Sequence, residues 1–220
     1  MAGRYTKEEL KEMLHRSAFK VVAASGIENV TVRSVSRGCG LSDPFIYQCY
    51  SDLPDLMTDA FLKIDREIAD SINRVIQDQL SVGSKDIERI CWALWSTYWN
   101  FLMQDPDKIV FYWRFYQSGY YNREILELRQ KNFYALTSFM YAAGEKTQLD
   151  QITNIDAIVS GIIDSTVSIA VKIHLGYMQI GDIPTQAIYG TVFSYLMHLL
   201  GVDVWQVIQE THEKTGVTEK

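Results

Sequence analysis

Hydrophobic positions recur at helical spacing along most of the chain. The first such segment follows Thr6, which stands with Glu9 at the Thr-x-x-Glu spacing of a capping box, and its apolar positions fall three and four residues apart. Ser25 and Gly26 end this segment, because glycine readily adopts the left-handed conformation that closes a helix. The pattern therefore predicts a first helix that ends at residue 25.

Two short helical segments follow. Thr31 is the predicted N-cap of a second helix, which ends at the glycines of residues 38–40. Ser42 is the next N-cap, with Pro44 near the first helical position, and this third helix is predicted to end near residue 50. Two short helices joined by a tight glycine-containing turn are the sequence form of a helix-turn-helix.

Long amphipathic segments occupy the rest of the chain, and no internal repeat is visible. Residues 107–183 contain no proline, as a helical protein allows. The further predicted helices span residues 55–80, 84–104, 106–118, 122–144, 154–176 and 185–209. We predict an all-α protein with an N-terminal three-helix unit, residues 1–52, and a larger helical body, residues 53–220.

Charge is unevenly distributed. The net charge of −6 argues against non-specific coating of nucleic acid, since phosphate binding depends on Lys and Arg. The first 50 residues nevertheless hold seven Lys and Arg against five Asp and Glu, so the N-terminal unit alone has a basic balance.

Several features predict a soluble cytoplasmic protein. The three cysteines have no CxxC spacing, which excludes a disulfide framework and a thiolate zinc cluster and fits a reducing compartment. The N-terminus has alternating charges instead of the apolar core of a secretory signal. The most apolar stretch, residues 157–178, contains Asp164, Lys172 and His174, which would be costly in lipid, so we expect a buried helix and no membrane span.

Residues 14–56 contain a pattern that is kept without gaps from Gly26 to Leu56. Its matching positions are Leu14, Ala18, Phe19, Val22, Gly26, Thr31, Val32, Arg33, Val35, Gly40, Leu41, Ser42, Ile46, Tyr47, Tyr50 and Leu56. On these residues the segment resembles the DNA-binding region of the tetracycline-repressor-like (TetR/AcrR) family of bacterial transcription regulators. The resemblance implies a homodimer, in which each subunit has a three-helix DNA-binding head and a larger helical body that binds a small molecule. Such a dimer reads a pseudo-palindromic operator, with its recognition helices about 34 Å apart.

The N-terminal unit offers candidates for both kinds of DNA contact. Expected phosphate contacts are Arg33 and Arg37 with Arg4, Lys7 and Lys11, and Thr31 and Tyr47 add hydrogen bonds. The residues expected to face bases are Ser42, Asp43, Phe45 and Gln48. Gln pairs with adenine, Asp accepts from cytosine, and Phe touches the thymine methyl group.

The recognition segment departs from the family in its charge. Most relatives have Lys, Arg or His where this chain has Asp43, Gln48, Cys49 and Leu53. No Lys, Arg or His occurs in residues 42–62, so phosphate attraction at this face is expected to be weak and its salt dependence shallow. In the alternative reading, the helix-turn-helix remains only as a packing unit and the protein is a co-regulator that acts through a protein partner.

The segment from residue 91 to residue 121 is unusually rich in aromatic rings. If some of these rings line an apolar ligand cavity, we expect the lining residues to be Trp95, Tyr98, Trp99, Tyr112, Phe115 and Tyr116. The alternative for each ring is ordinary core packing. Asp164 interrupts an apolar helix and, with ring faces, would hold a cationic ligand; alternatively it lies on a solvated stripe or pairs with a Lys or His.

The last two predicted helices place small residues among apolar neighbours. We expect Ser160, Ser168, Gly190 and Ser194 in a dimer interface, because small residues let helices approach closely and this helix pair resembles the four-helix dimer bundle of the family. Core packing within one subunit is the alternative.

No catalytic pattern is visible. The four histidines have no metal-ligand spacing, and there is neither a nucleophile elbow nor a glycine-rich phosphate loop. We therefore predict no enzyme activity, no metal and no cofactor. The predicted function is that of a ligand-responsive repressor of transcription, in which a small hydrophobic or cationic effector changes operator affinity by population shift.

Overall fold

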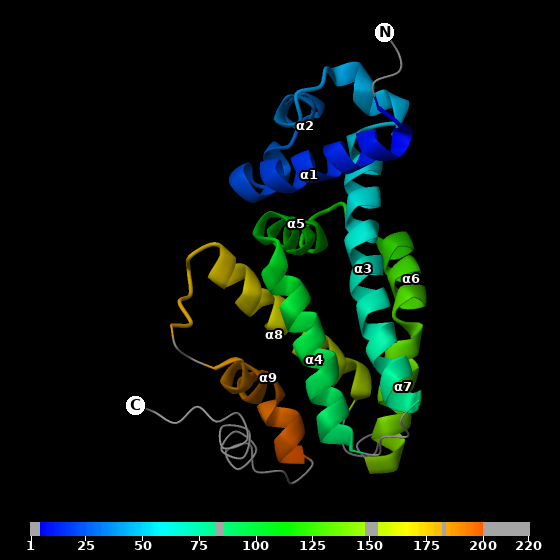
Figure 1. Ribbon diagram of the computed structural model, residues 1–220, viewed down its shortest axis with the longest axis vertical. Coiled ribbons are helices and arrows are strands. Elements are labelled where there is room, and N and C mark those ends of the chain that lie inside the picture. The colour runs from blue at the N-terminus through cyan, green and yellow to red at the C-terminus, as the bar shows by residue number, and fades with distance from the viewer. Residues whose placement is uncertain (1–4, 82–85, 148–153, 182–183, 200–220) are drawn as a thin grey trace. The chain divides into compact units, whose positions relative to one another are not determined.

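Helices make up all of the regular structure that is described. A computed structural model of the chain describes residues 5–81, 86–147, 154–181 and 184–199, and within these ranges the predicted all-α class is confirmed (Figure 1). The elements are α1 (Lys7–Ser25), η1 (Ile27–Asn29), α2 (Val32–Gly38), η2 (Asp43–Gln48), α3 (Leu53–Ser81), α4 (Ile87–Gln104), α5 (Pro106–Tyr116), α6 (Arg123–Asn132), α7 (Tyr134–Thr147), α8 (Ile155–His174) and α9 (Thr185–Leu199).

The first helix begins and ends as its sequence predicts. The backbone N–H of Glu9 donates to Thr6 Oγ1 at 3.2 Å, and the backbone N–H of Thr6 donates back to Glu9 Oε2 at 2.7 Å. At the other end Gly26 has a φ of +88°, which favours glycine. The capping box and the terminal glycine are thus both confirmed.

Two predicted elements differ in the structure, and a third is described only in part. The segment after Ser42 is a 3-10 helix and not an α-helix, and Ser42 makes no side-chain cap hydrogen bond. The helix predicted over residues 122–144 is two helices that meet at Phe133. The helix predicted over residues 185–209 is described as far as residue 199, and the remainder lies outside the described residues.

The chain forms two compact units. Unit 1 contains residues 1–73 and 100–134, and unit 2 contains residues 74–99 and 135–220. Unit 1 therefore includes α5 and α6 as well as the N-terminal helices, whereas the predicted functional division falls at residue 52. That functional division remains a prediction.

In unit 1, α1 packs between α2 on one side and α5 on the other (Figure 1). Leu14, Ala18 and Val22 of α1 are completely buried. The ring of Phe19 lies 4.9 Å from the ring of Phe111 on α5. Arg114 of α5 donates hydrogen bonds to the last carbonyl groups of α1, those of Val22 and Ala23. Because α1 has no basic residue in its last turn, Arg114 supplies the cation that a helix C-terminus favours.

In unit 2, α8 and α9 pack together and their inner faces contribute to a core of aromatic rings. Helix α8 is long and apolar enough to cross a membrane by length and composition, which is weak evidence because the core helix of a soluble protein passes the same test. Residues 157–178 were expected to form a buried helix, but α8 is buried only in part. Its side chains at Ile158, Val167, Ala170 and Val171 are buried, whereas much of the remaining surface of α8 is not covered by its own unit.

Candidate nucleic-acid interface and ligand site

Two glycines determine how α2 meets α1 and η2. A Cβ atom at Gly38 would lie 2.2 Å from Ser17 Oγ, whose hydroxyl donates to the carbonyl oxygen of Val35 at 2.6 Å. Gly40 has a φ of +71°, in the region that favours glycine. The close approach at Gly38 and the turn at Gly40 therefore set the geometry of the helix-turn-helix.

The segment η2 lies at the surface. Tyr47 is 59% exposed, and Ser42 and Gln48 are also exposed. Asp43 and Phe45 are partly exposed, whereas Ile46 is buried and anchors the segment. The residues expected to face bases are therefore accessible, which is the first requirement of a recognition element.

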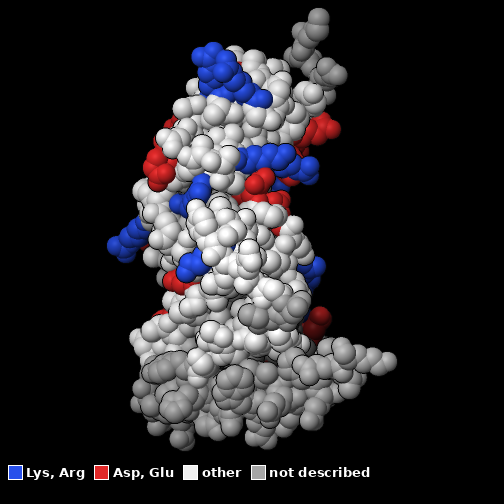
Figure 2. Space-filling model, turned by 90° about the vertical axis from the view of Figure 1, so that its left-hand side faces the viewer, with Lys and Arg blue, Asp and Glu red and all other residues white. Residues whose placement is uncertain are grey.

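The expected polar contacts of α2 are accessible too. Thr31, Arg33 and Arg37 are all exposed. The hydroxyl of Thr31 also caps α2, since it accepts a hydrogen bond from the backbone N–H of Ser34 at 3.0 Å. Figure 2 shows Lys and Arg side chains gathered at the upper end of the face that it draws.

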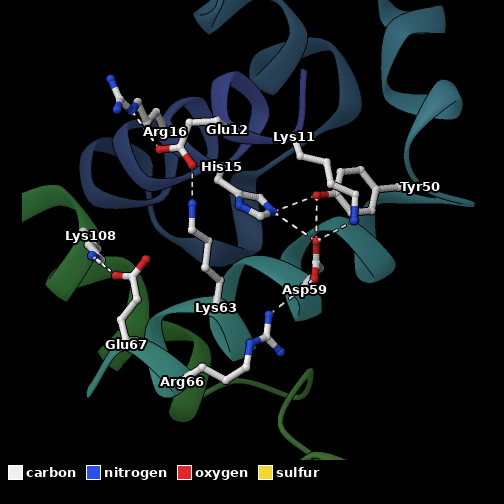
Figure 3. A network of polar contacts seen from close by, with 10 residues as sticks. All are labelled: Lys11, Glu12, His15, Arg16, Tyr50, Asp59, Lys63, Arg66, Glu67 and Lys108. Carbon is white, nitrogen blue, oxygen red and sulfur yellow. Dashed lines mark hydrogen bonds and ion pairs between the residues drawn. The ribbon is translucent and has the colours of Figure 1, made fainter. Parts of the chain in front are cut away.

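The expected contribution of α1 to phosphate binding is only partly available. Arg4 lies outside the described residues, and Lys7 is exposed. The ammonium group of Lys11 lies 3.3 Å from Asp59 Oδ2 and 5.2 Å from the centre of the Tyr50 ring (Figure 3). Lys11 is thus engaged by its own chain, because the carboxylate of α3 lies close to its position on α1.

The predicted ligand-binding rings fall into two clusters. Trp95, Tyr98 and Trp99 belong to unit 2, whereas Tyr112, Phe115 and Tyr116 belong to unit 1. All of these rings are buried except that of Tyr116, which is partly exposed. Asp164, the proposed anionic partner, is partly exposed on α8 of unit 2.

In unit 2 the tryptophans form a continuous cluster with α9. The Trp95 ring stacks on Trp99 at 5.5 Å and meets Tyr189 edge-on at 5.3 Å. The indole N–H of Trp95 donates to Thr166 Oγ1 at 3.0 Å. The hydroxyl of Tyr189 is buried without a hydrogen-bond partner among the described residues, and burial raises the pKa of this tyrosine. Sequence reasoning missed Tyr189, although its position among apolar residues of the last predicted helix was visible.

In unit 1 the rings surround an ion pair that sequence reasoning also missed. The carboxylate of Asp65 is completely buried and accepts from Tyr112 Oη at 3.0 Å and from Arg129 Nε at 2.9 Å. Asn132 donates to its other oxygen at 3.2 Å. The guanidinium group of Arg129 lies 5.1 Å from the ring centre of Tyr116 and 5.9 Å from that of Tyr112. A carboxylate, aromatic rings and a cation thus meet in unit 1, but they are Asp65 and the chain's own Arg129, and the cation site expected at Asp164 remains a prediction.

A periodicity signal for Asp65 was present. It lies four residues after Phe61 and three before Ile68, on the face of α3 that is buried throughout this stretch. An acidic residue at such a position requires a partner, but the sequence does not indicate which basic residue supplies it.

The expected dimer residues lie on different surfaces. Ser160 and Ser194 are exposed and Ser168 is partly exposed, whereas Gly190 is buried within its own subunit. On α8, Gly161 and Ser165 are exposed beside Ser160. Small side chains thus occupy one uncovered strip of α8.

No metal-binding group is visible in the described part of the chain. Within residues 5–81, 86–147, 154–181 and 184–199, no three His, Cys, Asp or Glu side chains are grouped so that they could hold an ion.

Comparisons with known proteins place the fold. No protein-family model matches the chain, and no curated protein matches its sequence. The structure is similar to a TetR family transcription regulator from Marinobacter aquaeolei VT8, with 16% identity and a TM-score of 0.62 over 79% of this chain and 87% of that chain. It is also similar to a putative transcriptional regulator from Pseudomonas aeruginosa PAO1, with 10% identity and a TM-score of 0.64 over 92% and 96% of the two chains.

A third solved structure has a similar fold. A putative TetR family regulator from Vibrio parahaemolyticus has 17% identity and a TM-score of 0.61, over 84% of this chain and 97% of that one. At such low identity the likeness is one of fold. The chain has the fold of the tetracycline-repressor-like transcription regulators, and the resemblance predicted from residues 14–56 is confirmed at that level.

Proposed function

We propose that the protein is a cytoplasmic, DNA-binding transcription regulator that binds a pseudo-palindromic operator as a homodimer and represses transcription. The observation that supports this most directly is the exposed segment η2, which follows a turn shaped by Gly38 and Gly40. It is the element that a helix-turn-helix protein presents to the major groove.

Phosphate binding is assigned to α2, where Arg33 and Arg37 are exposed. Base recognition is assigned to η2, where Gln48 suits adenine and the ring of Phe45 suits a thymine methyl group. Since η2 has no basic residue, few phosphates are neutralised and the salt dependence of binding is shallow.

Fluorescence anisotropy with DNA that flanks the protein's own gene, at two salt concentrations, tests this proposal. We expect sequence-dependent binding, and Arg37→Ala should reduce the slope of log K against log salt by about 0.9. Arg123→Ala is the matched control, because Arg123 is an exposed arginine on α6 that pairs with Glu127. Binding that is absent for the wild type at low salt contradicts the proposal.

The effector is assigned to the ring cluster of unit 2, around Trp95, Trp99 and the hydroxyl of Tyr189, which has no hydrogen-bond partner in the described ranges of the chain. A small hydrophobic or cationic molecule suits such surroundings, since rings supply apolar contact and cation–π attraction. Quenching of tryptophan fluorescence by tetraphenylphosphonium and by a neutral alkyl glycoside distinguishes the two classes. A signal that neither probe changes, in wild type and Trp95→Phe alike, contradicts a site there.

Dimerisation is assigned to the uncovered strip of α8 with Ser160 and Ser168, together with Ser194 of α9. In sedimentation velocity, Ser160→Arg should convert the dimer to a monomer, because a long cation would separate closely packed helices. Ser81→Arg is the control, since Ser81 is exposed at the end of α3.

A second candidate function is that of a co-regulator that acts through a protein partner. The observation that favours it is the charge of residues 42–62, which contain four Asp and no Lys, Arg or His. Absence of sequence-dependent DNA binding at low salt, with the fold intact, would select this candidate.

A further inference from the structure

The hydroxyl of Tyr50 joins three elements of unit 1. Tyr50 lies between η2 and α3, and its Oη atom is 2.7 Å from His15 Nε2 on α1 (Figure 3). The same hydroxyl donates to Asp59 Oδ2 on α3 at 2.9 Å. His15 Nε2 is itself 3.4 Å from Asp59 Oδ2, so the three polar groups lie within reach of one another.

Two of the three groups are shielded from water, since His15 is 3% exposed and Tyr50 is 5% exposed, whereas the Asp59 side chain is 30% exposed. Hydrogen bonds of this kind, with one ionised partner and little competing water, are stronger than those between neutral exposed groups. Lys11 and Arg66 lie on the solvent side of Asp59, at 3.3 Å and 3.9 Å from its oxygens, and favour its ionised form.

One arrangement of protons satisfies the cluster. The Tyr50 hydroxyl has a single hydrogen, which it donates to Asp59, so His15 must donate its Nε2–H to the tyrosine oxygen. His15 Nδ1 is buried and has no hydrogen-bond partner among the residues that the structure describes, which suits a bare nitrogen better than an N–H. The chain of donors thus runs from α1 through Tyr50 to α3.

The segment η2 depends on such side-chain anchors. As a 3-10 helix of six residues it has weaker backbone hydrogen bonds than an α-helix. It is anchored by Ile46, which is completely buried, and at its end by Tyr50. The apolar side chain of Ile46 makes only non-directional contacts, whereas the Tyr50 hydroxyl makes directional ones.

We propose that Tyr50 is a positioning residue for DNA recognition: its hydroxyl, held by Asp59 and His15, orients η2 so that the exposed side chains of Ser42 and Gln48 meet the bases. This inference rests on the proposed function. A phenylalanine at position 50 would keep the ring in the core and remove only the directional contacts.

The test begins with selection of a binding sequence from a randomised duplex library by the wild-type protein. Affinities of the full-length wild type and Tyr50→Phe are then measured for the selected duplex and for a scrambled duplex, along with the thermal midpoint. Tyr141→Phe is the matched control, because Tyr141 also donates to an aspartate, Asp156 Oδ2 at 2.7 Å, but is exposed and lies in unit 2.

We expect Tyr50→Phe to weaken binding to the selected duplex about tenfold and to leave binding to the scrambled duplex unchanged. Asp59→Asn should weaken selected binding in the same direction. The double variant should bind as Tyr50→Phe does, because both changes remove one network.

The outcomes separate the two proposals. If the wild type enriches no sequence, the proposed DNA-binding function fails, and this inference fails with it. If a sequence is enriched but Tyr50→Phe binds it as tightly as Tyr141→Phe does, the positioning role alone is overturned. Equal weakening on both duplexes with a large drop in thermal midpoint would assign Tyr50 a purely structural role and also overturn it.

Discussion

The Asp65 cluster of unit 1 and the Trp95 cluster of unit 2 each bury aromatic rings around polar atoms, but they differ in how the Asp65 carboxylate and the Tyr189 hydroxyl are satisfied. In unit 1 the Asp65 carboxylate takes hydrogen bonds from Tyr112, Arg129 and Asn132. In unit 2 the indole N–H of Trp95 donates a hydrogen bond to the hydroxyl of Thr166, while the Tyr189 hydroxyl has no hydrogen-bond partner among the described residues.

The difference separates a structural cluster from a candidate binding cluster. A buried network whose members are all paired stiffens the elements that it joins, here α3, α5 and α6. A buried hydroxyl without a partner leaves an interaction that a bound molecule would supply. Tyr112 and Tyr116 already face a cation, Arg129, so the proposed effector is better accommodated by the rings of unit 2.

The largest effect is expected when the ion pair of unit 1 is broken. Arg129→Met should lower the free energy of unfolding by about 3–5 kcal/mol, because it leaves the Asp65 carboxylate buried without its cation. Urea denaturation followed by circular dichroism measures this. Arg123→Ala, which breaks an exposed pair on the same helix, should leave the unfolding curve almost unchanged. If Arg129→Met and Arg123→Ala gave similar unfolding curves, the hydrogen-bonded network around Asp65 would not be a structural one.

A smaller loss is expected from the tyrosine of the same network. Tyr112→Phe removes one donor to Asp65 and one acceptor for Arg129 and should cost about 2 kcal/mol. The same denaturation experiment tests it. A variant as stable as the wild type would mean that Arg129 and Asn132 satisfy Asp65 without the hydroxyl.

The contact between α1 and α3 at Asp59 makes the stability of unit 1 depend on pH. The nearby Nε2 atom of His15, opposed by burial and supported by the hydrogen bond from Tyr50, holds the pKa of Asp59 well below its ordinary value. Its stabilising contribution is therefore complete above the ordinary carboxyl pKa of about 4 and is lost as the pH falls toward the lowered folded-state pKa.

Asp59→Asn should thus cost about 1 kcal/mol of unfolding free energy at neutral pH, an amount reduced for the partial exposure of the carboxylate, and progressively less below about pH 4. Denaturation at a series of pH values measures whether the unfolding free energies of the wild type and Asp59→Asn converge as the pH falls. Asp156→Asn in unit 2 serves as the control, and a difference between wild type and Asp59→Asn that is constant with pH would contradict the expectation.

The smallest effect has the opposite sign and belongs to unit 2. Tyr189→Phe removes a hydroxyl that is buried and has no partner within the described part of the chain, so the unfolding free energy should rise by up to about 1 kcal/mol. The same substitution should weaken binding of a neutral alkyl glycoside more than that of tetraphenylphosphonium, which accepts no hydrogen bond. A loss of stability comparable to that of Tyr112→Phe would remove the contrast between the two clusters.

Local signals in the sequence were sufficient for much of the fold. The limits of α1 followed from Thr6, Glu9 and Gly26, because capping and a positive φ depend on neighbouring residues. The helix-turn-helix of residues 31–50 was located for the same reason. The candidates in α2 and η2 were found at accessible positions, and their contact with DNA remains a prediction.

Elements whose form depends on distant contacts were predicted less well. The segment after Ser42 has the cap and proline of an α-helix, yet it forms a 3-10 helix anchored by Ile46 and Tyr50. The break at Phe133 has no proline or glycine to mark it. It coincides with Arg129 and Asn132, which both reach Asp65.

By itself the sequence determined that the protein is helical, where a capped helix such as α1 begins and ends, and which faces are apolar, since periodicity and capping act within a few residues. Only the tertiary structure decided that Arg129 is the partner of Asp65, 64 residues away, that Lys11 turns to Asp59, and that the aromatic set divides between two units. Periodicity identifies a buried face but not what covers it, because that choice is made by packing between segments far apart in the chain.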